Sequence, residues 1–225
     1  MNVFSQTLLW LGDASNWEGT GGISVRLVQH MQYSLATLAI TCVIAIPLAC
    51  YIGHFGRALF VIPVINALRA LPTLGMLSAL ALIFGLGISA PMIVMVMFAI
   101  PPVLAATYSG IANVSQTTTH AMRAIGFSEW QILWNVELPT AFPAILGGIR
   151  SAFTQIIATW TVAAFLPVGG LGRFLIDGLA IRDYSQMLGA SFLVIGLSIA
   201  VDVLMLIVQN TIERHSRYSQ LTTQS

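Results

Sequence analysis

Two charged residues, Arg69 and Asp202, stand inside long apolar stretches, where a charge is unusual. A charge at membrane depth is costly and generally faces a bundle interior or a water-filled path, so both are candidates for lining a translocation path. A structural ion pair or a hydrogen-bonded helix contact explains them equally well, and sequence alone does not tell whether the two meet. Phe98 and Trp160 are further candidates for the path, although an aromatic residue at helical spacing is more often a packing residue.

The remaining reactive residue types form no catalytic or metal-binding pattern. The sequence contains no HExxH, no CxxC and no GxxxxGK[ST] motif, and its four histidines are scattered without metal-ligand spacing. We therefore expect no metal, no cofactor and no enzymatic activity, and in particular no binding or hydrolysis of ATP by this chain itself.

Composition indicates a membrane protein. Of the 225 residues, 57% are hydrophobic and 8% are charged, whereas soluble domains carry about 25% charged residues. The net charge of +1 argues against nucleic acid as a partner. Cys42 and Cys50 lie eight residues apart in one apolar run, about 12 Å along a helix, which is too far for a disulfide.

The hydropathy pattern predicts an all-α membrane protein, a five-helix transmembrane bundle in one domain. The expected spans are residues 25–53, 58–86, 90–111, 142–165 and 187–209, with a Gly-rich link and a short interfacial helix at 167–184. In the second stretch Pro63, Arg69 and Pro72 predict a shallow or broken first part, with the continuous span beginning near Leu71. The third contains Pro101 and Pro102, which favours a place inside the bundle, where neighbours satisfy the freed carbonyls.

Five spans put the termini on opposite sides, and arginine counts predict the orientation. One side holds Arg57, Arg123, Arg150, Arg214 and Arg217, and the other holds Arg26, Arg173 and Arg182. The positive-inside rule then predicts an external N-terminal segment at 1–24, a transmembrane domain at 25–210 and a cytoplasmic tail at 211–225.

A polar island, residues 120–139, interrupts the apolar pattern, and we call it the plug. Gly126 suits a left-handed residue that ends a first short helix, and Ser128 with Gln131 has capping-box spacing for the start of a second. Pro139 is expected to stop that second helix. The stripe formed by Trp130, Leu133, Trp134 and Leu138 would also suit an amphipathic helix that rests on lipid headgroups.

The plug resembles the coupling loop of permease subunits of binding-protein-dependent ABC importers, in which Glu-Ala-Ala, three residues, Gly, nine residues, Ile, one residue and Leu-Pro recur. Matching positions are Ala121, Gly126, Val136, Leu138 and Pro139, while His120 and Met122 depart from the pattern. The resemblance implies a cytoplasmic coupling helix-turn-helix that docks on an ATPase subunit. Its expected contact residues are Ala121, Gly126, Trp130, Leu133, Trp134, Glu137, Leu138 and Pro139.

Three further stretches resemble the osmoprotectant branch of these permeases: residues 69–74, 168–172 with 177–179, and 136–139 running on to 147–150. The resemblance implies alternating-access import of glycine betaine, choline or carnitine across a bacterial plasma (inner) membrane. Its implied partners are two ATP-binding subunits, an external substrate-binding protein, a second permease copy or a sister permease, and membrane lipid. Arg69 and Asp202 give the spans one charge of each sign, which suits a zwitterion. The alternatives are another small solute such as an amino acid, or a self-contained channel or carrier.

Overall fold

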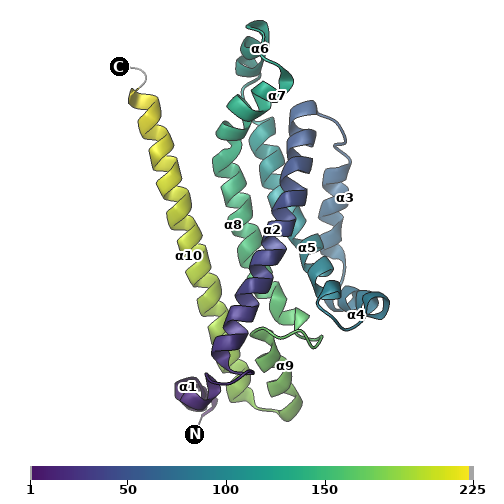
Figure 1. Cartoon of the computed structure of the whole chain (residues 1–225), viewed down its shortest axis with the longest axis vertical. Coiled ribbons are helices and arrows are strands. Elements are labelled where there is room, and N and C mark those ends of the chain that lie inside the picture. Colours follow the sequence, from purple (N-terminus) through teal and green to yellow (C-terminus); the bar gives the residue numbers. More distant parts are fainter. Residues whose placement is uncertain (1, 223–225) are drawn as a thin grey trace.

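The protein is a bundle of helices that run between two ends of an elongated molecule (Figure 1). The computed structural model describes residues 2–222, with side chains as far as residue 212, and every regular element in that range is helical. The α-helices are α1 (Val3–Gly12), α2 (Ile23–Phe55), α3 (Val61–Ala67), α4 (Thr73–Phe84), α5 (Ser89–Ala112), α6 (Gln116–Ala124), α7 (Glu129–Ile132), α8 (Leu138–Ala163), α9 (Gly172–Ile181) and α10 (Tyr184–Thr222).

Among the described residues, four segments are long and apolar enough to cross a membrane, as predicted: Ile23–Phe55, Ser89–Ala112, Glu129–Ala163 and Tyr184–Ile212. The pair Val61–Ala70 and Thr73–Phe84 is apolar enough only when taken together, and it is bent by 97°, as in a broken span or a re-entrant loop. The second stretch is therefore broken, as expected. The all-α membrane bundle is confirmed, with four long spans and, when the bent pair is counted as one span, a fifth.

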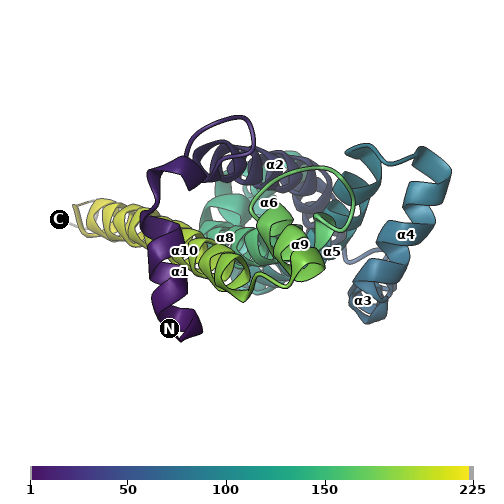
Figure 2. The same ribbon diagram turned by 90° about the horizontal axis from the view of Figure 1, so that it is seen from below.

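The prediction that a continuous span begins near Leu71 is wrong, because the bend falls at that point. Leu71 is extended (φ −75°, ψ 137°), the conformation that a following proline imposes on its neighbour. After Pro72, α4 has 12 residues, about 18 Å of helix, which is shorter than the hydrocarbon core. Figure 2 shows α4 turned outward, away from the bundle.

Helix α5 forms the centre of the bundle and packs against α2 and α8. Gly148 marks the closest approach of α5 and α8, since a Cβ there would lie 2.5 Å from Ala106 Cβ. Phe98 and Trp160, both predicted as possible path residues, belong to this core with 7% and 2% of their surface exposed. The Trp160 indole donates a hydrogen bond to Thr37 Oγ1 at 2.9 Å.

The paired prolines of α5 lie inside the bundle, as predicted. Pro102 has no N–H, so the carbonyl of Phe98 loses its helical partner. Gln155 on α8 replaces it, since its Nε2 donates to the Phe98 carbonyl at 3.2 Å. A neighbouring helix thus satisfies the carbonyl that proline leaves free.

The short helices α1 and α9 lie at the end of the bundle that Figure 2 shows from below. The side chain of Thr7 in α1 donates to the Ser185 carbonyl at the start of α10 (3.3 Å). The Gly-rich link forms the predicted short helix, α9, and the Gly170 N–H donates to Gln29 Oε1 at 3.3 Å. Gly172 sits so close to α8 that a Cβ there would lie 2.6 Å from Thr161 Cα.

Helix α10 runs the full length of the molecule and leans away from the other spans towards its C-terminal end (Figure 1). That end lies on the same side of the bundle as α6 and α7, opposite α1 and α9. Residues 211–222 of the predicted tail continue α10, and residues 223–225 lie outside the described range.

Candidate functional site

The turn inside the plug has the local structure that its sequence predicts. Gly126 is left-handed (φ 93°), its N–H donates to the Arg123 carbonyl, and the Phe127 N–H donates to the Met122 carbonyl (3.0 and 3.1 Å). This pair of bonds is a Schellman motif. At the start of α7 the Ser128 N–H donates to Gln131 Oε1, and the Gln131 N–H donates to Ser128 Oγ, which completes the capping box.

The prediction that Pro139 stops the second helix of the plug is wrong. α7 runs through a π-helical turn, Leu133–Glu137, directly into α8, so that Glu129–Ala163 is one continuous segment. Pro139 is the second residue of α8 and directly follows this π turn, where the helical hydrogen bonds change register. The bond from the Leu138 N–H to the Leu133 carbonyl closes the wider turn. The second helix of the plug is therefore a continuous extension of a membrane span.

A buried histidine ties the plug to a second span. His54, in the last turn of α2, places Nδ1 2.6 Å from Glu137 Oε2, and the two side chains are only 1% and 7% exposed. Its Nε2 lies 3.1 Å from Glu129 Oε2, a close polar contact without hydrogen-bond alignment. Glu129 in turn accepts two hydrogen bonds from Arg123 at 2.8 and 2.9 Å. These contacts link α2, the π turn, α7 and α6.

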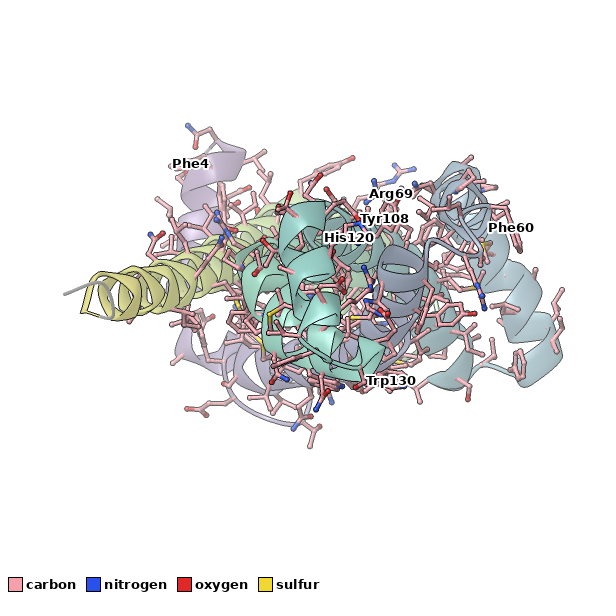
Figure 3. The ribbon with its side chains drawn as sticks, turned by 90° about the horizontal axis from the view of Figure 1, so that it is seen from above. Phe4, Phe60, Arg69, Tyr108, His120 and Trp130 are labelled. Carbon is pink, nitrogen blue, oxygen red and sulfur yellow. The ribbon has the colours of Figure 1, made fainter. Side chains whose placement is uncertain are left out.

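An apolar groove of about 270 Å³ lies beside this network. Its walls come from the end of α2 and from the plug, and they include Tyr51, Phe55, Trp130 and Trp134. The rings of Phe55 and Trp130 meet edge to face at 6.4 Å. Figure 3 looks onto this end of the bundle and shows Trp130 at the outer edge of the bundle.

The predicted contact residues of the plug divide into an exposed and a buried set. The exposed ones are Ala121, Gly126, Trp130, Trp134 and Pro139, whereas Leu138 is half-buried and Leu133 and Glu137 are buried. Leu133 packs in a cluster with Cys50, Ile111, Ala141 and Ile145. Leu133 and Glu137 thus face the chain's own bundle, which their spacing in the sequence did not indicate.

The two predicted membrane charges do not meet. Asp202 pairs with Arg150, whose Nε and Nη2 donate to its two carboxylate oxygens at 2.7 and 2.8 Å. Arg69 instead donates to Gln155 Oε1 at 3.5 Å. Sequence analysis counted Arg150 among the arginines on one side of the membrane and did not identify it as the partner of Asp202. The signal for it was a polar stripe in the fourth span, because Arg150, Ser151, Thr154 and Gln155 recur at helical spacing.

The fold and this site define a multi-span, all-helical membrane protein with a plug fixed to two of its spans. Residues 43–218 match the family described as "Binding-protein-dependent transport system inner membrane component", and the chain belongs to that family.

Three relatives illustrate the similarity. A carnitine transport permease protein of Listeria monocytogenes (strain 10403S) is 32% identical over 82% of this chain and 83% of its own length. A glycine betaine/carnitine/choline permease protein of Bacillus subtilis is 26% identical over 85% and 89%. A solved structure of the MetNI methionine ABC transporter, in an inward facing conformation, shares the fold with a TM-score of 0.74, at 17% identity over 91% and 97% of the two chains.

Proposed function

We propose that this chain is the permease subunit of an ATP-driven importer for small osmoprotectants such as glycine betaine, choline or carnitine. Membership of the family makes it the membrane component of a binding-protein-dependent transport system. The substrate class is supported by the relatives, whose names specify carnitine, choline and glycine betaine. ATP hydrolysis belongs to a separate subunit, and this chain supplies the path.

The proposed mechanism is alternating access driven through the plug. Two ATPase subunits act on two permease chains, which are either two copies of this chain or this chain and a sister, while an external binding protein delivers the solute. The exposed residues Ala121, Gly126, Trp130 and Trp134 would face the ATPase. The way in which the plug is attached to the spans supports this mechanism. The plug runs directly into α8, and His54 of α2 contacts its residue Glu137. A displacement of the plug would then move two spans together.

We further propose that the plug end is cytoplasmic and the α1–α9 end is external, in a bacterial inner membrane with lipid around the bundle. Because Arg150 lies near the middle of α8, it no longer counts towards either side. The arginine bias becomes four (Arg57, Arg123, Arg214 and Arg217) to three (Arg26, Arg173 and Arg182), still in the same direction.

The observation that carries the proposal is the plug fixed to two spans in a chain whose similar relatives are osmoprotectant permeases. The test is uptake of labelled glycine betaine, carnitine, choline and methionine by cells that express the chain with its ATPase and binding protein, at low and high osmolarity. We expect uptake of at least one of the first three and none of methionine. Uptake of methionine alone would reject the osmoprotectant assignment and keep the importer.

A further inference from the structure

A polar groove of about 650 Å³ runs between α8 and α10, and the family assignment does not explain it. Arg150, Ser151, Thr154 and Gln155 line it from one face of α8, while Ser198 and Asp202 line it from α10. The opposite face of α8, with Ala152, Phe153, Ile156 and Ile157, is buried in the core. A membrane span with one polar face borders protein or water rather than lipid.

The groove contains a bidentate ion pair at membrane depth. Arg150 lies near the middle of α8, and Asp202 is flanked by the apolar run 192–208. The pair is nevertheless open, since the two side chains are 29% and 35% exposed towards the groove that they line. Thr154 Oγ1 lies 3.5 Å from Asp202 Oδ1 and donates to the Arg150 carbonyl at 3.1 Å. The pair is therefore accessible to a solute that enters the groove.

We propose that the α8–α10 groove is a binding site for a zwitterionic solute, whose carboxylate binds Arg150 and whose cationic head lies against Asp202. This proposal rests on the proposed import function and names the class of solute that the permease itself recognises. The site would make the permease selective in addition to the external binding protein.

The chemistry of the pair favours a zwitterion over an ion. A guanidinium has five N–H donors, and Asp202 uses one on Nε and one on Nη2, so donors on Nη1 and Nη2 remain for a second carboxylate. The side of the Asp202 carboxylate that faces away from Arg150 can attract a quaternary ammonium group by charge alone, since such a group has no N–H to donate. The pair has no net charge, so it presents a dipole along which a zwitterion aligns in the opposite sense. A simple cation such as choline meets only Asp202.

The first test compares solutes in cells or proteoliposomes that contain the whole importer. We expect Arg150→Gln to raise the apparent KM for carnitine and glycine betaine about ten-fold or more, the loss expected for a charge-assisted hydrogen bond, with a smaller change for choline. Asp202→Asn should weaken uptake of all three solutes. Arg173→Gln is the matched control, because Arg173 and Asp177 form a similar pair on α9, away from the groove. The control should leave the ratio of carnitine to choline uptake unchanged.

The failure of this proposal is distinguishable from failure of the import function. If wild-type cells take up none of the solutes, the proposed function fails. If wild-type cells do take up the solutes, the variants decide. The site is overturned, and the pair is structural, if Arg150→Gln lowers the uptake of all solutes in equal proportion and the swap Arg150→Asp with Asp202→Arg restores that uptake.

A binding test does not depend on uptake. In a cysteine-free background, Ser198→Cys in membrane vesicles should react more slowly with a thiol reagent when glycine betaine is present, and choline should protect less. Protection that is absent, or that is equal for both solutes, would overturn the site.

Discussion

The contact between His54 and Glu137 should be a main attachment of the plug, and its energetic role can be measured. Glu137 is 5% exposed and its carboxylate lies 2.6 Å from His54 Nδ1. His54→Ala would leave that carboxylate buried without its partner, which costs about 3–5 kcal/mol. For a chain of this length such a loss lowers the melting temperature by about 6–20 °C. The measurement is thermal unfolding of the purified full chain in lipid nanodiscs, followed by tryptophan fluorescence.

A double variant separates the charge from the packing. His54→Leu combined with Glu137→Met replaces the buried pair by apolar groups, a change that is often neutral, so stability should return close to that of the wild type. His120→Ala is the control, because His120 is exposed on α6 and its removal should change the melting temperature by little. The single variants His54→Leu and Glu137→Met complete the cycle. A double variant whose loss equals the sum of these two single losses would refute the reasoning, since it would show that the two side chains do not depend on each other.

Other predictions concern the turn, the topology and the Gly-rich link. Gly126→Val should insert normally but abolish stimulation of the ATPase, because φ of 93° is unsuited to a β-branched residue; Gly196→Val, which also meets no neighbour, should retain stimulation. Ser15→Cys and Thr118→Cys place single cysteines at two exposed positions. In intact cells an impermeant thiol reagent should label the cysteine at position 15 and leave the one at position 118 unlabelled. The reverse labelling pattern would show that the orientation is inverted. Gly172→Ala should lower the yield of folded protein, measured by size-exclusion chromatography, because its Cβ would overlap the backbone of the last turns of α8.

The features that sequence analysis predicted well are local. Gly126 and the Ser128–Gln131 box depend on neighbouring residues alone, so their spacing was sufficient. The apolar runs likewise define the spans because membrane crossing depends on length and hydropathy. Pro139 was misjudged because the π turn directly before it keeps the chain helical, and a π turn cannot be recognised from the spacing of the residues.

The features that sequence analysis missed depend on contacts between distant segments. The partner of Asp202 lies on another span, and no periodicity within α10 could identify Arg150. The first predicted span ended at residue 53, whereas α2 extends to Phe55 and brings the ring of His54 against Glu137 of the plug. The stripe of Trp130, Leu133 and Trp134 looked uniform, but packing of α2 and α5 against Leu133 divides it.

The most direct test of the account is accumulation of labelled glycine betaine in proteoliposomes that contain this chain with its ATPase and binding protein. We predict accumulation against a gradient only when ATP and the binding protein are both present, with ADP in place of ATP giving none. Equal flux through the chain alone, without ATP or the ATPase, would contradict the account and identify the chain as a self-contained channel or carrier.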